Sequence, residues 1–383
     1  MKLFKDKLAW AAPIAVILII ALFSINLFAQ GDPKVRNLPV ALIINDEGVH
    51  VDAVKSAVEQ MSKGTDGEEP MLAFTNENEA DIEELFDDKK YYAALVVPEG
   101  YSDSLQNAMT NNRAATLKIY INQGFNVTGA NYAKTALCAL VTQLNQQYSA
   151  SFMEQMNGQK IDADAAAVLV NPIVSEEKVF NKVTASTANG SAPTLMAVPA
   201  WVGALIGGFI LFLSTSNIMK KEWLTRKQTL RLMGGQFLFG VIIALFSGFT
   251  VATLGLIAGI NMPGYFLVGS FVSFAALCFF LLVSAITAWI GKPAITLLMV
   301  VMLLGMGVLM MPKEMLPDFF VTFIRPWIPI RFASDGLREI FYFGSGFYTG
   351  QSFNIISGIG IVGFVIYLLS IFKPVRVKTT NAN

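Results

Sequence analysis

The sequence is poor in the residue types on which most catalytic and metal sites depend. Its 383 residues include one histidine, His50, and two cysteines, Cys138 and Cys278. A catalytic base or a metal site built from histidine is therefore nearly excluded, and the cysteines show no metal-ligand spacing. Cys138 falls in a polar region and Cys278 in an apolar run. We expect two free thiols on different sides of a membrane–water boundary and no disulfide.

Charge is also scarce. Charged residues make up 15% of the chain and hydrophobic residues 54%, whereas a soluble domain carries about 25% charged residues. Lipid is therefore the expected main solvent. The sequence has no Gly-x-x-x-x-Gly-Lys-Ser/Thr loop and no Ser-His-Asp set. We predict no enzyme activity, no catalytic or metal residues and no cofactor held by this chain.

Long uncharged stretches dominate what is present. A bilayer core about 30 Å thick needs about 20 apolar residues in a helix. Six stretches qualify, and we predict transmembrane helices at 8–29, 196–217, 237–259, 265–290, 294–311 and 354–372. The first follows three lysines as a signal peptide does, but its apolar run is longer than usual, which favours an uncleaved anchor.

The basic residues are sorted along the chain. The short segments 1–7, 218–236, 291–293 and 373–383 together hold twelve Lys/Arg and two acidic residues. Because basic loops stay in the cytoplasm, we predict a multi-pass plasma-membrane protein with both termini cytoplasmic. Residues 30–195, which carry more acidic than basic side chains, are then extracytoplasmic.

The predicted exported segment alternates strand and helix patterns. Apolar runs closed by turn residues indicate strands at 38–44, 71–75, 93–97 and 116–121, and helical patterns lie near 51–63, 78–90, 102–111 and 128–156. Ser102 or Asp103 is the expected cap of the third helix. The fold class predicted for the chain is an α-helical polytopic membrane protein with an inserted α/β extracytoplasmic domain, an open sheet covered by helices. The acidic pairs of 78–90 are interpreted as a solvated face.

Two connecting segments are unusual. Wound as a helix, 218–236 places Met219, Trp223 and Leu230 along one face beside a basic stripe. It either docks on a cytoplasmic partner or rests on anionic lipid. Segment 312–353 is apolar and interrupted by prolines. It is either a partly re-entrant segment beside a pathway mouth or an interfacial amphipathic lid.

Three segments together resemble ABC-2-type exporter permeases, in particular the YhgE/Pip branch with a large exported domain after the first span. They are Asn37-Leu38-Pro39-Val40-Ala41 continuing to Glu47, Tyr92-Ala93-Ala94-Leu95-Val96 continuing to Ser102, and Met311–Pro317 followed by Pro329–Glu339. The long coiled-coil stalk of larger members of the branch is absent.

The resemblance implies two sets of functional residues. The loop after the second span would couple to an ATPase through Lys220, Lys221, Glu222, Trp223, Arg226 and Lys227. The outer gate segment would include Pro317, Pro329, Arg331, Asp335 and Arg338. ATP and Mg would be bound by a separate cytoplasmic ABC ATPase subunit. Six spans make half a transporter, which implies a homodimer or a heterodimer with a sister permease, and no nucleic-acid partner.

The leading hypothesis is a permease subunit of an ABC-type exporter that moves a lipophilic or amphipathic substrate outward. No charged residue lies within any predicted span, which argues against an ion-coupled transporter. The alternative is a non-transporting cell-surface receptor, or an envelope or secretion assembly scaffold of the YhgE/Pip type.

Overall fold

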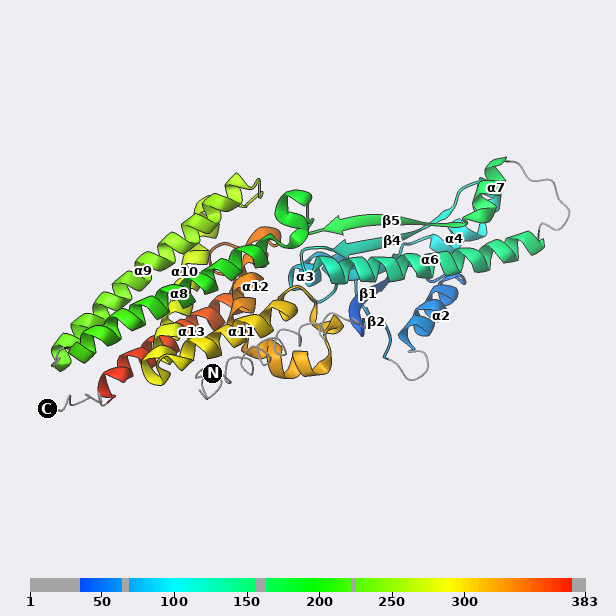
Figure 1. Ribbon diagram of the computed structural model, residues 1–383. Helices are drawn as coiled ribbons and strands as arrows, with labels where there is room; N and C mark the ends of the chain where they lie inside the picture. Colours follow the sequence, from blue (N-terminus) through cyan, green and yellow to red (C-terminus); the bar gives the residue numbers. More distant parts are fainter. Residues whose placement is uncertain (1–34, 64–68, 156–162, 222–224, 374–383) are drawn as a thin grey trace, which may run out of the picture. The chain divides into compact units, whose positions relative to one another are not determined.

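The computed structural model describes residues 35–63, 69–155, 163–221 and 225–373 (Figure 1). The expected helix at 8–29, the segment 1–7 and residues 374–383 lie outside this part. The chain forms two compact units. An α/β unit contains Pro33–Val183 and Met311–Leu316, and a helical unit contains Thr184–Met310 and the residues from Pro317 onward.

The α/β unit is built on a five-stranded mixed sheet with the strand order β2-β1-β3-β4-β5. Strands β3 and β4 are antiparallel, and the other neighbouring pairs are parallel. The strands are β1 (Leu38–Ile44), β2 (Leu72–Asn76), β3 (Ala93–Val97), β4 (Ala115–Asn122) and β5 (Ile173–Phe180). The helices are α2 (Val51–Ser62), α3 (Ile82–Asp87), α4 (Tyr101–Gln106), α5 (Ala108–Asn111), α6 (Val127–Gln155) and α7 (Ala163–Val170), with a 3₁₀ turn η2 (Glu79–Asp81) before α3.

Helices cover both faces of this sheet. Side chains alternate along β1, so Leu38 and Val40 pack in one core with α2 and α6, while Ile43 packs in a second core with α3. The long helix α6 runs along the sheet (Figure 1). Because both faces are covered, β1 and β3 are apolar at nearly every position. The expected α/β domain is confirmed.

Several local expectations were wrong. Helix 78–90 is the turn η2 followed by the six-residue α3. Helix 102–111 is split into α4 and α5, and it follows Gly100, whose φ of 75° needs a glycine, rather than a Ser or Asp cap. Strand β5 and helix α7 were not expected. The middle six residues of β5 are exposed at the sheet edge, so the strand lacks the alternation by which a sequence reveals it.

The helical unit is arranged around α10 (Tyr265–Ile290), which packs against α8 (Ala192–Lys221), α9 (Arg226–Ile257) and α13 (Gly350–Leu369). Glycines bring α9 and α10 close: a Cβ on Gly240 would overlap Phe280, and one on Gly248 would overlap the α10 backbone. The remaining elements are α11 (Pro293–Leu309), α12 (Pro329–Tyr342), the 3₁₀ turns η3 (Ala185–Gly190), η6 (Arg325–Trp327) and η7 (Ser370–Phe372), and the π-helical turn η5 (Phe320–Ile324).

Four helices of the described residues are long and apolar enough to cross a bilayer: α8, α9, α10 and α13 continued through η7. Helix α11 is also apolar but has 17 residues, which rise about 26 Å. Six spans are therefore not established, because the first expected span lies outside the described part and α11 is short. The apolar helices agree with a membrane protein.

Each of the two connecting segments is divided among several elements. Segment 218–236 is mostly a continuation of long helices, since α8 extends to Lys221 and α9 begins at Arg226 behind a capping box between Thr225 and Gln228. Segment 312–353 is divided between the two units. Residues Met311–Leu316, with the turn η4 (Lys313–Met315), belong to the α/β unit. There the Glu314 side chain accepts a hydrogen bond from the Tyr92 hydroxyl (2.8 Å) and its carbonyl accepts one from the Arg36 amide (3.1 Å).

Candidate cavity of the helical unit

A cavity of about 540 Å³ lies among α8, α9, α10 and α13, near the end of the unit where α8 and α10 finish and α9 begins. Its apolar lining comes from Phe212, Met219, Met233 and Ala288. Its polar lining consists mainly of uncharged groups, from Thr215, Ser216, Thr229, Gln236, Ser284, Tyr367 and Ser370. These polar lining residues carry no charge and stand beside or within apolar runs, so the sequence alone does not set them apart.

A buried amide organises the polar side of the cavity. The Oε1 of Gln236 on α9 accepts hydrogen bonds from the Tyr367 hydroxyl of α13 (2.9 Å) and from the Thr215 hydroxyl of α8 (3.1 Å). Thr215 shares its proton with the carbonyl of Leu211, one turn earlier on its own helix (2.7 Å). Three helices are thereby joined through one uncharged side chain. In the sequence, the only indication of this role is that Gln236 stands directly before an apolar run.

Two further groups distinguish the cavity from ordinary helix packing. The Ser284 hydroxyl is buried and has no hydrogen-bond partner among the described residues. The Nζ of Lys373 donates to the carbonyls of Ala288 (3.1 Å) and Trp289 (2.7 Å). These carbonyls belong to the last turn of α10, where the helix itself offers no partner. Lys373 is the only charged side chain that lines the cavity among the described residues. A cavity with this lining suits a ligand that carries an uncharged polar group.

The predicted coupling residues are only partly described. Lys220 and Lys221 are the last residues of α8, but their side chains lie outside the described part, as do Glu222 and Trp223. Arg226 and Lys227 are exposed in the first turn of α9. The guanidinium of Arg226 lies over the ring of Phe372, 5.7 Å from its centroid. Since Met219 and Thr229 line the cavity, these basic residues lie at the same end of the helical unit.

The predicted outer-gate residues belong mainly to α12. Pro329 is its first residue, where a proline costs no hydrogen bond. Arg331 and Asp335 form the ion pair expected from their spacing, with Nε and Oδ2 3.9 Å apart. Arg338 lies one turn further along α12. Pro317 begins the part of the chain that returns to the helical unit, and its carbonyl accepts the Phe320 amide (2.8 Å).

Helix α12 packs against α8 and α13 through its apolar face. Its Ser334 hydroxyl is hydrogen-bonded to Thr194 of α8 at 2.7 Å, in a buried position. The structure therefore fixes α12 firmly to the bundle. The gating role of its residues stays a prediction.

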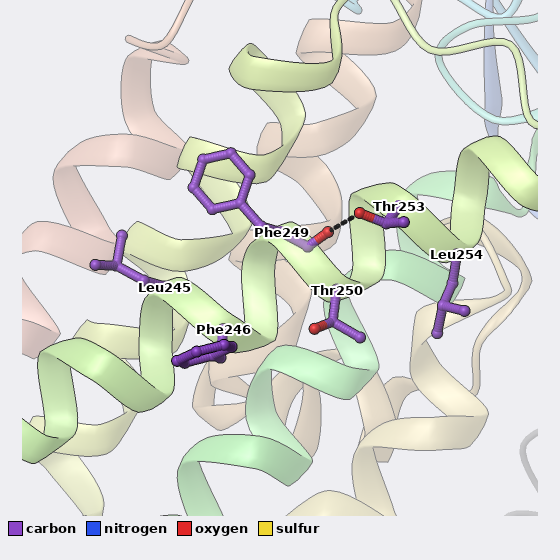
Figure 2. Close-up of a pocket in the computed structure, with 6 residues that line it drawn as sticks. All are labelled: Leu245, Phe246, Phe249, Thr250, Thr253 and Leu254. Carbon is purple, nitrogen blue, oxygen red and sulfur yellow. Dashed lines mark hydrogen bonds between the residues drawn. The ribbon is translucent and has the colours of Figure 1, made fainter.

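A second, shallower groove lies along α9 alone (Figure 2). It measures about 380 Å³ and is lined by Leu245, Phe246, Phe249, Thr250, Thr253 and Leu254. The Thr253 hydroxyl is already bonded to the Phe249 carbonyl (2.7 Å). Most of the surface is exposed hydrocarbon. A single helix with few free polar groups offers little specificity, so the deeper cavity among four helices is the better candidate site.

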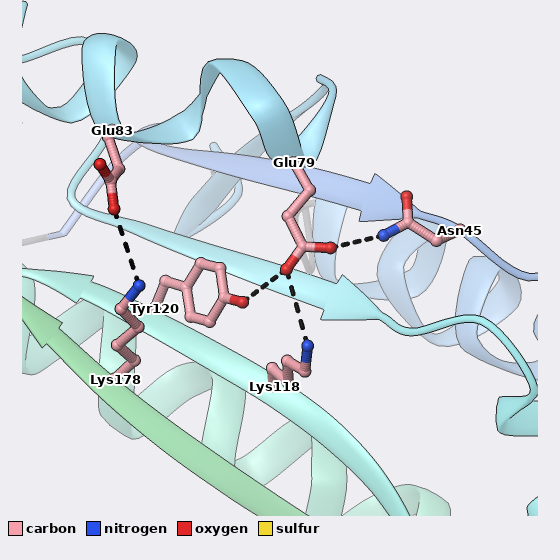
Figure 3. Close-up of polar contacts among 6 residues, drawn as sticks. All are labelled: Asn45, Glu79, Glu83, Lys118, Tyr120 and Lys178. Atoms are coloured by element: carbon pink, nitrogen blue, oxygen red, sulfur yellow. Dashed lines mark hydrogen bonds and ion pairs between the residues drawn. The ribbon is translucent and has the colours of Figure 1, made fainter.

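The α/β unit contains a polar cluster of a different kind (Figure 3). The Glu79 carboxylate accepts hydrogen bonds from the Tyr120 hydroxyl (2.5 Å) and the Asn45 amide (2.6 Å), and Lys118 lies 3.7 Å away. The hydrogen bond from Tyr120, helped by Lys118 and Asn45 and opposed by burial, lowers the pKa of Glu79. Burial and the Glu79 charge raise the pKa of Tyr120. The cluster joins η2 to β1 and β4, and we interpret it as structural.

Comparisons with known proteins agree with the membrane part of the structure. The family model described as ABC-2 family transporter protein matches residues 9–371. A crystal structure of a domain assigned to an ABC type-2 transporter from Thermotoga maritima MSB8 is 18% identical. That match covers 37% of this chain and 86% of the other, with a TM-score of 0.25, which is too low to inform the fold. No curated protein matches the chain. Because the family match spans nearly all of the sequence, the protein belongs to the ABC-2 family of transporter membrane proteins.

Proposed function

We propose that the chain is the permease subunit of an ABC-2 exporter, which moves a lipophilic or amphipathic substrate outward with energy from a separate ATPase. The observation that carries this proposal is the family match over residues 9–371. The cavity supports it, because it lies inside an apolar bundle and is lined mainly by uncharged side chains. Family membership implies a partner ATPase.

The connection between α8 and α9 is the proposed docking surface for that ATPase. It is followed by the exposed Arg226 and Lys227 in the first turn of α9, at the same end of the bundle as the cavity. Basic residues mark the cytoplasmic side of membrane proteins. Movement of this connection would shift the ends of α8 and α9, and so change the cavity wall at Met219 and Thr229. ATP binding would thereby alter access to the cavity.

The finer features follow from the same proposal. The α/β unit is extracytoplasmic, the protein lies in the plasma membrane, and the chain represents the YhgE/Pip-like branch. Two permease chains, identical or related, form the transporter. Helix α12 and its ion pair between Arg331 and Asp335 lie at the outer end of the route and act as a gate.

Purification of the full chain from its own membranes tests the proposal directly. A P-loop ATPase should co-purify, and its ATPase activity in lipid nanodiscs should depend on the permease. Substitution of Trp223 and Arg226 by alanine should reduce both association and activity. Arg113→Ala, an exposed charge removed from the α/β unit, is the matched control. Association and activity that are the same in the coupling variants and the control would contradict the coupling role. Absence of any ATPase would favour the receptor or scaffold alternative.

Orientation has its own test. In intact cells, external protease should cleave a site introduced at residues 64–68. A site introduced at the C-terminus should be protected. The opposite pattern would refute export through this topology.

A further inference from the structure

We infer that the cavity among α8, α9, α10 and α13 binds an amphiphile whose headgroup is uncharged and forms hydrogen bonds, such as a glycoside or a fatty amide. The role of the cavity as the cargo site of an exporter rests on the proposed function, but binding of the amphiphile does not require transport. Three features of the cavity lead to this ligand class.

The first feature is a buried hydroxyl without a partner. Ser284 is among the residues that line the cavity and is 1% exposed, and its buried hydroxyl has no hydrogen bond among the described residues. Serine in a helix commonly bonds a carbonyl one turn earlier, as nearby Thr287 does with Val283. Leaving a buried hydroxyl unsatisfied is unfavourable. A ligand atom in the cavity is the missing partner.

Gln236 adds a second free position. Its Oε1 accepts two hydrogen bonds, from Thr215 and Tyr367, but its Nε2 has no acceptor within the described part of the chain. Gln236 is itself 6% exposed and lines the same cavity. A bound group that offers an acceptor to Gln236 and a donor or an acceptor to Ser284 would satisfy both. Hydroxyl and amide groups have this chemistry.

The second feature is the balance of charge. No carboxylate lines the cavity in the described part, so a cationic headgroup would be buried unpaired and beside the ammonium of Lys373. An anionic headgroup has Lys373 alone as its partner. That ammonium is exposed and already bound to the carbonyls of Ala288 and Trp289. An uncharged headgroup avoids both desolvation costs.

The third feature is the apolar part of the wall. A volume of about 540 Å³ falls within the roughly 300–1,000 Å³ of small-molecule sites. Phe212, Met219 and Met233 supply hydrocarbon surface beside the polar groups. Methionine side chains adapt to ligands of different shape. The wall therefore accepts part of an alkyl chain while the headgroup contacts Gln236 and Ser284.

Photolabelling of the full chain in lipid nanodiscs, without ATPase or ATP, tests the inference. The probe is an octyl glucoside with a diazirine in its alkyl chain, used below the concentration that disrupts the bilayer. Labelled peptides should come from α8, α9, α10 and α13. Unlabelled octyl glucoside should compete for labelling. Octyl sulfate and octyl trimethylammonium should compete at least tenfold less well, and equal or better competition by either would overturn the inference.

Side-chain variants separate recognition from general hydrophobicity. Ser284→Ala removes a hydroxyl with no partner in the described part, so the protein should fold with unchanged thermal stability but bind the probe about two- to tenfold more weakly, the range for one hydrogen bond. Gln236→Leu should weaken binding at least as much. Ser357→Ala is the control, because that hydroxyl of α13 already bonds the Phe353 carbonyl (2.8 Å). Labelling that Ser284→Ala leaves unchanged in folded protein would overturn the inference.

The outcome is distinguishable from failure of the proposed function. Loss of ATPase coupling with retained, Ser284-dependent labelling would contradict transport but keep the site. Retained ATPase coupling with labelling that does not depend on Ser284 or Gln236 would contradict the binding site but keep transport.

Discussion

Substitution of Glu79 by glutamine should destabilise the α/β unit by about 2 kcal/mol. The carboxylate accepts two short hydrogen bonds, from Tyr120 (2.5 Å) and Asn45 (2.6 Å). Hydrogen bonds to a charged group contribute about 1.5–3 kcal/mol, against about 0.5–1.5 kcal/mol for neutral ones, so the loss is about 1 kcal/mol for each. The ion pair with Lys118 (3.7 Å) joins side chains that are each about one-third exposed, and solvent screening limits it to under about 1 kcal/mol.

Hydrogen–deuterium exchange of β4 amides in the full-length protein measures this effect. A loss of about 2 kcal/mol corresponds to roughly 30-fold faster exchange. The pKa of Glu79 is lowered from its usual 4.5, so its stabilisation is complete above that value and is lost as the pH falls through the folded-state pKa. The difference between wild type and Glu79→Gln should therefore be constant near neutral pH and shrink below pH 4.5.

Glu83→Gln is the matched control, because Glu83 belongs to the adjacent helix α3 and pairs with Lys178 (3.7 Å) while 73% exposed (Figure 3). An exposed pair of this kind contributes little, and β4 exchange should stay within about threefold of wild type. Equal effects of the two substitutions would refute the argument. So would a difference between wild type and Glu79→Gln that does not change with pH.

Three other outcomes are expected. Gly248→Ala should lower the free energy of unfolding of the detergent-solubilised protein by about 1–3 kcal/mol through overpacking, because the new methyl group meets the Gly269 carbonyl of α10. The thermal midpoint should fall accordingly. Gly235→Ala, where nothing lies within contact distance, should have no such effect. Asn122→Leu should destabilise the α/β unit by about 1–3 kcal/mol, seen as faster β3 and β4 exchange, because the fully buried Asn122 amide donates to the Phe86 and Tyr91 carbonyls and the Phe86 carbonyl alone keeps another donor, the Lys89 amide. Burial and a nearby glutamate raise the pKa of the Cys138 thiol. Its alkylation by iodoacetamide, measured by mass spectrometry, should therefore be slower at pH 8 than that of a fully solvent-exposed cysteine and should become faster as the pH rises.

The sequence identified those parts of the fold in which local pattern and burial agree. Strands β1 and β3 have the expected bounds, because continuous apolar runs closed by turn residues mark strands buried on both faces. The apolar helices were found because each contains an uncharged run long enough to cross a bilayer, although α8 and α9 extend beyond these runs into the basic loop between them. There helix-forming residues and a capping box at Thr225 continue the structure beyond the hydrocarbon region.

Other features depend on tertiary contacts that one sequence does not display. Strand β5 is an exposed edge, and its polar residues become a strand because they pair with β4. The antiparallel direction of β4 against β3 is likewise a property of the assembled sheet. The cavity brings Gln236, Ser284 and Tyr367 together from three helices. Each of them alone is an ordinary uncharged residue beside or within an apolar run.

The α/β unit consists of two stretches of chain, 33–183 and 311–316, that are separated by more than a hundred residues. The ribosome therefore finishes most of this unit early. It makes the last six residues, 311–316, only after it has synthesised α8 to α11. Until then the Tyr92 hydroxyl, in a side chain that is 1% exposed in the final structure, lacks its Glu314 partner. The unit therefore gains this hydrogen bond only after most of the helices have been made, and a fragment ending at residue 183 would lack it unless 311–316 were supplied as a peptide.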